Sequence, residues 1–148
     1  MSRRVVLDTS TLVSAALRTD SIPHQALLEA FRSWDVCTSE ETLAELGRVL
    51  EREKFDRYLP RRRRLEFVAL IRRRSPVFAV EEAHVQAVRP PCRDPLDDKF
   101  LALALSAEAD VVISSDEELL VLHPWRGIPI VTPMGFLSWL GRSPEVPA

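Results

Sequence analysis

Aspartates follow two short apolar runs of the sequence, and these acids are well placed to do chemistry. Residues 4–7 (Arg-Val-Val-Leu) lead into Asp8, and residues 111–113 (Val-Val-Ile) lead through two serines into Asp116. Short apolar runs of this kind are typical of strands buried on both faces of a parallel sheet. Ligands bind at the carboxyl ends of such strands. We therefore expect Asp8 and Asp116 to meet in one crevice.

A second group of acids, Asp94, Asp97 and Asp98, stands at the start of a predicted helix. The apolar residues of this helix recur at helical spacing, and they are Leu96, Phe100, Leu103 and Ala107. Acids at a helix N-terminus cap free N–H groups and oppose the macrodipole. Capping explains one of these carboxylates, but it does not explain all three.

Carboxylates gathered within a few ångströms cannot all stay ionised unless a cation compensates them. Oxygen ligands without His or Cys favour Mg²⁺ or Mn²⁺ over Zn²⁺. The few histidines and cysteines are scattered without the spacing of a zinc site, and they are His24, His84, His123, Cys37 and Cys92. An ion held by these acids would bind a phosphate oxygen and activate water. Phosphodiester hydrolysis is the reaction that these parts indicate.

Other α/β families that place an aspartate after the first strand fit less well. Haloacid-dehalogenase-like phosphatases need a second aspartate two residues later, where this chain has Ser10. Response-regulator receivers need paired acids upstream of a central aspartate, which this order does not supply. The four glycines are not clustered, so a glycine-rich phosphate loop is also excluded.

Glu45 lies on the flank of a helix that we expect to begin at a capping box formed by Thr38 and Glu41 and to end near Glu51. Taken alone, Glu45 is an ordinary solvated residue, because acids on helices usually face water. Its position therefore has no functional meaning without further information.

Eight arginines fall between positions 57 and 74, and they include the run Arg61, Arg62, Arg63 and Arg64. One interpretation is a solvated helix face that balances acids elsewhere. The other is contact with phosphate groups or with an acidic segment of a partner, since guanidinium groups match both geometries. The sequence leaves these two alternatives open.

Five apolar runs, at 4–7, 34–37, 76–80, 111–113 and 128–131, alternate with helical patterns. This order predicts an α/β fold with a mostly parallel sheet covered on both faces. We expect a single domain over residues 1–141 and a disordered tail at 142–148. No run is long enough to span a membrane, and two isolated cysteines favour the cytoplasm.

Read together, these pieces resemble the PIN-domain ribonucleases, and most closely their VapC-like toxin branch. That branch carries Asp-Pro-x-Asp, then Phe-Leu-x-x-Ala, then a strand that ends in Asp. The matching stretches are residues 5–10, 39–46, 94–104, 112–120 and 130–137. The resemblance implies a three-layer α/β/α PIN-like fold with about five strands.

The resemblance also assigns roles to individual residues. It implies that Asp8, Glu45, Asp97 and Asp116 coordinate one or two divalent ions, Mg²⁺ or Mn²⁺, with Asp94 as an additional acid. The supporting positions are Ser10, Ser114 and Asp98, and each differs from the residue that relatives often carry. Ser10 and Ser114 stand where relatives often carry Asn and Thr, and Asp98 stands where they often carry Asn.

The implied function is a metal-dependent endoribonuclease that serves as the toxin of a type II toxin–antitoxin pair. RNA would be the substrate, a cognate antitoxin protein the partner, and a homodimer the assembly. Two alternatives remain open at this point. One is a catalytically silent PIN module that binds RNA or protein, and the other is a structure-specific DNA nuclease of the same superfamily.

Overall fold

A four-stranded parallel sheet forms the centre of the protein in a computed structural model, which describes residues 3–140. The strands are β1 (Arg3–Leu7), β2 (Trp34–Val36), β3 (Val111–Ile113) and β4 (Ile130–Val131), in the spatial order β2-β1-β3-β4. All neighbouring pairs are parallel. The chain runs from β1 to β2 on one side and then adds β3 and β4 on the other side of β1. The order of the sheet therefore reverses between β1 and β3.

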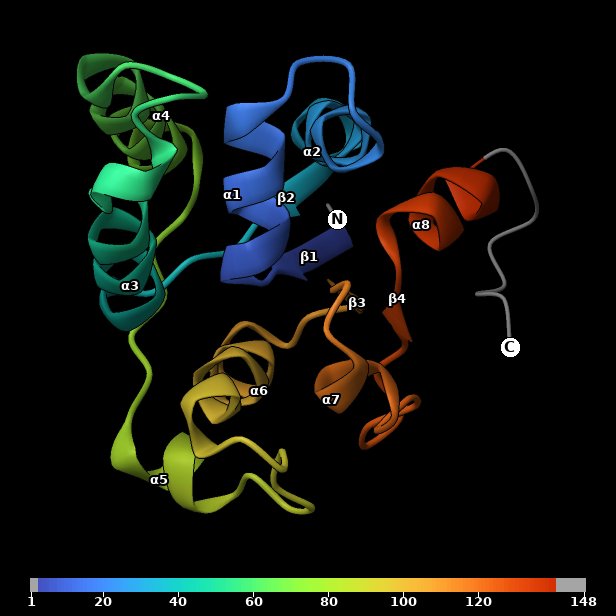
Figure 1. The fold of residues 1–148 in the computed structure, drawn as a ribbon. Coiled ribbons are helices and arrows are strands. Elements are labelled where there is room, and N and C mark those ends of the chain that lie inside the picture. The colour runs from blue at the N-terminus through green and yellow to red at the C-terminus, as the bar shows by residue number, and fades with distance from the viewer. Residues whose placement is uncertain (1–2, 141–148) are drawn as a thin grey trace.

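Helices cover both faces of this sheet (Figure 1). They are α1 (Thr9–Leu17), α2 (Ile22–Ser33), α3 (Glu40–Leu50), α4 (Arg61–Arg74), α5 (Glu82–Gln86), α6 (Asp98–Ala107), α7 (Glu117–Leu120) and α8 (Pro133–Leu140). Two 3₁₀ turns, η1 (Glu53–Phe55) and η2 (Pro95–Asp97), precede α4 and α6. None of the helices between residues 3 and 140 is both long enough and apolar enough to cross a membrane.

Side chains alternate between two cores, because successive residues of a strand point to opposite faces of a sheet. Val5 and Leu7 pack into the core under α1, α2, α3 and α8, whereas Val6 packs into the core under α6. The neighbouring strand does the same, with Val111 on the first side and Val112 on the second. The expected three-layer α/β/α architecture is thus confirmed.

The predicted fifth strand, at 76–80, is wrong. Only one bridge forms there, between Thr38 and Val77. Its hydrogen bonds run from the Thr38 N–H to the Pro76 carbonyl (3.1 Å) and from the Phe78 N–H to the Thr38 carbonyl (2.7 Å). Proline has no N–H to donate to a ladder, so this segment joins the sheet at one point and does not continue as a strand.

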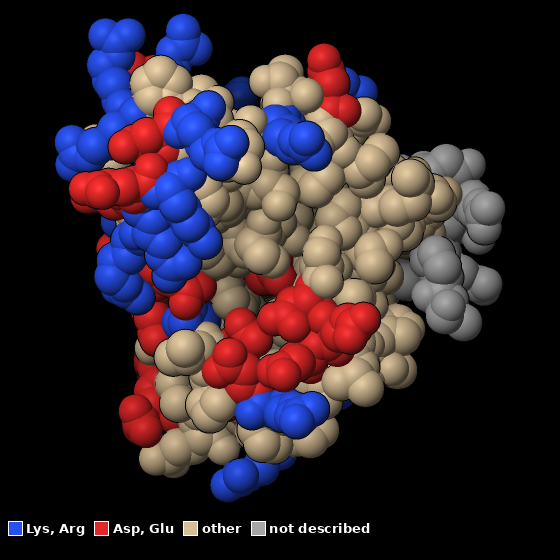
Figure 2. Space-filling view, viewed as in Figure 1, with Lys and Arg blue, Asp and Glu red and all other residues tan. Residues whose placement is uncertain are grey.

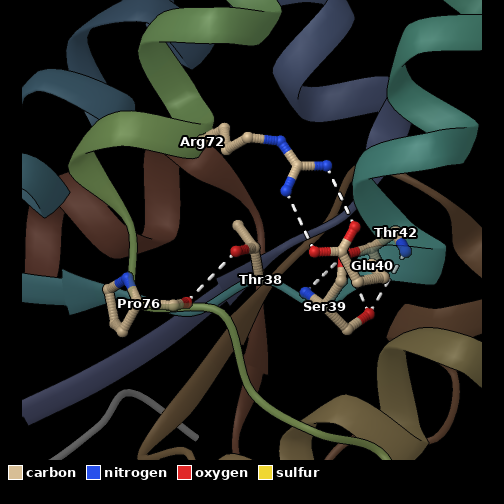
Figure 3. Close-up of polar contacts among 6 residues, drawn as sticks. All are labelled: Thr38, Ser39, Glu40, Thr42, Arg72 and Pro76. Atoms are coloured by element: carbon tan, nitrogen blue, oxygen red, sulfur yellow. Dashed lines mark hydrogen bonds and ion pairs between the residues drawn. The ribbon is translucent and has the colours of Figure 1, made fainter.

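The predicted capping box of α3 lies one residue further along the chain. Ser39, not Thr38, is the N-cap, and its partner is Thr42, not Glu41. The Thr42 N–H donates to Ser39 Oγ (3.2 Å) and the Ser39 N–H donates to Thr42 Oγ1 (3.0 Å) (Figure 3). Thr38 is not free to cap, because its hydroxyl donates to the Pro76 carbonyl (3.1 Å).

Helix α4 is tied to the first turn of α3 by a two-point ion pair. Arg72 donates to both carboxylate oxygens of Glu40, at 2.9 and 3.0 Å (Figure 3). This pairing lowers the pKa of Glu40 through the hydrogen bonds and charge of Arg72. The contact links the basic helix to the helix that carries Glu45. The predicted tail at 142–148, and the predicted domain end at 141, lie outside the described residues.

Candidate active site

The acids predicted from sequence come together where the sheet order reverses. Asp8 follows β1 and Asp116 follows β3, and the Asp8 N–H donates to the Ile113 carbonyl (3.2 Å). A cavity of about 390 Å³ opens at this edge. The predicted acids that line it are Asp8, Glu45, Asp94, Asp97 and Asp116, together with Ser10. Figure 2 shows acidic side chains gathered around a hollow on this face.

Asp8 is a buried carboxylate held in one orientation. It is 3% exposed and caps α1 by accepting from the Thr11 N–H (2.9 Å). The hydroxyls of Ser114 and Ser10 also donate to it, the latter at 3.3 Å. Burial raises the pKa of Asp8, while these hydrogen bonds oppose the rise. Ser10 and Ser114, which were predicted as supporting residues, thus both contact Asp8.

Asp94 and Asp116 also cap short helical segments, so capping accounts for one oxygen of each. Asp94 accepts from the Leu96 N–H (3.0 Å), and Asp116 accepts from the Glu118 N–H (2.9 Å). The Asp116 N–H in turn donates to Ser114 Oγ (2.9 Å). Ser114 therefore connects the two strand-end acids, because its own hydroxyl donates to Asp8.

Asp97 occupies the N-cap position of α6, yet its side chain makes no capping hydrogen bond. Partial burial raises the pKa of Asp97 to about 7, and the rise is increased by a hydrogen bond with Asp116 and by the charges of Asp116, Asp94 and Asp8. A carboxylate whose pKa is raised by neighbouring carboxylates lies in a site with too much negative charge. Such a site suits a cation, and its all-oxygen donor set suits Mg²⁺ or Mn²⁺.

Glu45 lines the cavity, and its carboxylate forms an ion pair with the side chain of Lys99. Lys99 Nζ lies 2.5 Å from Glu45 Oε2, and the Thr9 hydroxyl donates to Glu45 Oε1. Neither Lys99 nor Thr9 was predicted as a site residue from the sequence. Lys99 stands next to Asp98 in the acidic stretch, but its partner is far along the chain. Only the packing of α3 against α6 brings the pair together.

Asp98, predicted as a supporting residue, lies outside the wall of the cavity. Its Oδ1 accepts from the Cys92 N–H (2.6 Å), so it holds the loop that enters η2. Arg52 was also missed, and it is the one basic residue among the described residues that line the cavity. Apolar walls are supplied by α1, α3, η1 and α6 through Val13, Val49, Phe55 and Phe100.

Candidate ligand atoms are spread over this cavity. Between residues 3 and 140, one group of three acidic, Cys or His side chains has ligand atoms all within 4.8 Å of one another, and it is Cys92, Asp97 and Glu118. No three of the five predicted acids meet that distance in the described part of the chain. Since Mg²⁺ usually keeps several waters and takes one or two carboxylates directly, the cavity remains suited to a hydrated ion.

The arginine run divides into an exposed part and a buried part. Arg61, Arg62 and Arg63 are exposed at the start of α4, and Figure 2 shows basic side chains over this helix beside the acidic hollow. Arg61 pairs with Glu51 (3.4 Å) and Arg62 with Glu66 (3.7 Å). Both pairs are solvated, so they leave these guanidinium groups available to other anions.

Arg64 does not belong to this surface, and its predicted binding role is wrong. It is 0% exposed, and it donates to the carbonyls of Leu50 (2.7 Å) and Arg52 (2.9 Å) and to the Asp56 carboxylate. A helix leaves its last carbonyls without partners, and Arg64 satisfies the last one of α3. It also fixes the segment that carries Arg52 into the cavity wall.

Comparisons with known proteins agree with this fold. A family model described as PIN domain matches residues 4–118. PAE2754 from Pyrobaculum aerophilum is similar with a TM-score of 0.65 and 14% identity, over 96% of this chain and 100% of that one. VapBC2 from Rickettsia felis, bound to a DNA fragment from its promoter, is similar with a TM-score of 0.64 and 12% identity, over 87% of this chain and 98% of that one.

VapC20 from Mycobacterium tuberculosis, described as a Sarcin-Ricin loop cleaving toxin, gives a TM-score of 0.55 and 18% identity, over 80% of this chain and 95% of that one. At these identities the solved structures support the fold alone. Comparison with curated protein sequences gives no significant match. The family model, however, spans well over half of the chain, and the protein therefore belongs to the PIN-domain family.

Proposed function

We propose that this protein is a divalent-metal-dependent endoribonuclease that hydrolyses RNA phosphodiester bonds. The observation that carries the proposal is the cavity where Asp8, Asp97 and Asp116 converge from two strand ends and a helix start. The raised pKa of Asp97 supports it, because the site lacks the positive charge that its acids require. PIN-domain proteins are typically nucleases, and one of the similar structures is described as a Sarcin-Ricin loop cleaving toxin.

Asp8, Asp97 and Asp116 are the proposed ligands of Mg²⁺ or Mn²⁺, with Asp94 beside them. A bound ion supplies a Lewis acid that lowers the pKa of water and offsets charge on phosphate oxygens. Ser114 and Ser10 orient the Asp8 carboxylate toward its place in the site. Arg52 on the cavity wall is proposed to contact the phosphate that enters, since guanidinium groups match phosphate oxygens in geometry and charge.

The exposed arginines of α4 are proposed to hold the RNA backbone next to the cavity. Arg61, Arg62 and Arg63 project from the first turn of α4. That turn follows the segment containing Arg52, so the basic surface and the cavity wall are continuous in the chain. Phosphate contacts of this kind provide affinity without sequence specificity.

We further propose that the protein acts as the toxin of a type II toxin–antitoxin pair, in the cytoplasm and as a homodimer. A partner that carries both signs of charge would complement the acidic cavity and the basic α4 surface, since complementary charge favours association. The test is co-expression. This chain alone should slow bacterial growth, and the cognate antitoxin should restore it through a stable complex. A chain that cleaves RNA well in vitro but leaves growth unchanged contradicts the toxin role.

The nuclease itself is tested with matched substrates. Purified protein is incubated with a single-stranded RNA, a DNA of the same sequence and a flap DNA, with Mg²⁺ or Mn²⁺ and with EDTA. We expect internal cleavage of RNA that EDTA abolishes, and loss of cleavage in Asp8→Asn but not in Glu82→Gln, which removes an exposed carboxylate outside the cavity. Preferred cleavage of flap DNA supports the DNA-nuclease alternative, and binding without cleavage supports the silent module.

A further inference from the structure

The ammonium group of Lys99 is held in a fixed position behind the wall of the acidic cavity, against Glu45, which lines that cavity. Its Nζ lies 2.5 Å from Glu45 Oε2 and donates to the Leu96 carbonyl at 2.6 Å. The side chain is 8% exposed, and that of Glu45 is 19% exposed. Lysine is rarely buried to this degree unless it is paired. The pair therefore forms a desolvated contact between α3 and α6, and not a surface salt bridge.

Glu45 has both carboxylate oxygens engaged by this chain's own groups. Oε2 accepts from Lys99, and Oε1 accepts from the Thr9 hydroxyl. A charge-assisted contact of this length is among the strong hydrogen bonds. Replacing Lys99 at Oε2 with a metal ion would leave a buried ammonium without its counter-charge, which is costly. Glu45 is thus compensated already, before any ion binds.

The other acids form a separate group without such a cation. Asp8, Asp94, Asp97 and Asp116 line one cavity, and none of them forms an ion pair with a lysine or arginine among residues 3–140. Lys99 makes its ion pair with Glu45 instead. The cavity therefore has two regions. One contains carboxylates that need a cation, and the other contains a carboxylate that has one.

We propose that Lys99 takes the place of a second metal ion, so that the cavity binds one divalent ion through Asp8, Asp97 and Asp116. Glu45 is then a positioning residue that holds Lys99, and not a metal ligand. The inference rests on the proposed metal-dependent function, and it sets the number of ions at that site. It also assigns Lys99 a role through its charge, beyond the packing of α6 on α3.

The test counts bound Mn²⁺ by isothermal titration calorimetry and records its electron paramagnetic resonance spectrum, without substrate. The wild-type protein should bind one ion with the spectrum of isolated Mn²⁺. Lys99→Met removes the charge but keeps an unbranched side chain, and it should bind two ions with an exchange-coupled spectrum. Lys99→Arg keeps the charge and should again bind one. The double variant Glu45→Gln/Lys99→Met removes both charges of the pair, and it should bind one ion with an affinity within about threefold of wild type.

Several results overturn the inference. These are two ions in the wild-type protein, one ion in folded Lys99→Met, or a loss of affinity beyond threefold in Glu45→Gln/Lys99→Met. If Lys99→Met does not fold, the wild-type count still decides. Failure of the proposed function looks different. In that case the wild-type protein binds no Mn²⁺ or cleaves no RNA, whereas failure of this inference alone leaves metal-dependent cleavage intact with a second ion bound.

Discussion

Asp97 and Asp116 lie in the wall of one cavity, although Asp97 precedes α6 and Asp116 follows β3. Burial raises the pKa of Asp97, and the neighbouring Asp116 raises it further, because two carboxylates repel. Both residues line the cavity in which Asp8 ends β1. Asp97 therefore keeps its proton to a higher pH than an isolated carboxyl group does.

Raising the pH should weaken the metal-free protein through Asp97. Its pKa is about 7 in the folded state against 3.8 ordinarily, so the folded state keeps a proton that the unfolded chain has released. Stability is therefore lost between about pH 4 and pH 7. Because Asp97 is partly exposed, we expect a loss of only about 1–2 kcal/mol.

Urea unfolding in EDTA at pH 4 and pH 8 measures this effect, with Asp97→Asn as the reference. The free energy of unfolding should fall more in wild type than in the variant, and Mg²⁺ should reduce the difference. Equal pH dependence of the two proteins would show that the pKa of Asp97 is not raised in the folded state.

Arg64→Met should destabilise the fold by about 2–4 kcal/mol, because it leaves the carbonyls of Leu50 and Arg52 without their donor in a buried site. Arg63→Met, an exposed neighbour on the same helix, is the matched control and should stay within about 0.5 kcal/mol. Thermal melting of both variants checks the prediction. A similar melting temperature for the two would mean that Arg64 is not the internal support of the 51–60 segment.

Replacing Arg61, Arg62 and Arg63 together by Gln should weaken RNA binding and reduce its salt dependence. Loss of up to three phosphate contacts lowers the slope of log Kd against log salt by about 2 for single-stranded RNA. Fluorescence anisotropy from 50 to 300 mM salt measures both quantities. Arg18→Gln combined with Arg32→Gln, two exposed arginines outside α4, is the control. An unchanged slope in the triple variant would show that these arginines form a solvated helix face that does not contact RNA phosphates.

The strand-end acids were predictable because burial leaves a plain pattern in the sequence. The short apolar runs before Asp8 and Asp116 predict two strands, and they also predict that these acids lie at the carboxyl ends of those strands. Parallel pairing then brings the ends together without any information on side chains. The family resemblance added Glu45, which periodicity alone assigns to a solvated flank.

The features that were missed depend on contacts between distant segments. Arg64 resembles its three arginine neighbours in sequence. It is buried, however, because it donates a hydrogen bond to the last carbonyl of α3. Lys99 looks like a surface residue until α3 brings Glu45 against it. The 76–80 segment has the composition of a strand, yet Pro76 removes a donor and only one bridge forms.

The most direct test of the central claim is the rate of RNA hydrolysis by Asp97→Asn at saturating Mn²⁺. The substitution keeps the shape of the side chain and removes the carboxylate that has no capping role in α6. If the converging acids bind the ion that activates water, kcat/KM should fall at least 100-fold, about 2.7 kcal/mol of transition-state stabilisation, while the melting temperature is retained. A kcat/KM within threefold of wild type would contradict the claim that these acids form the active site.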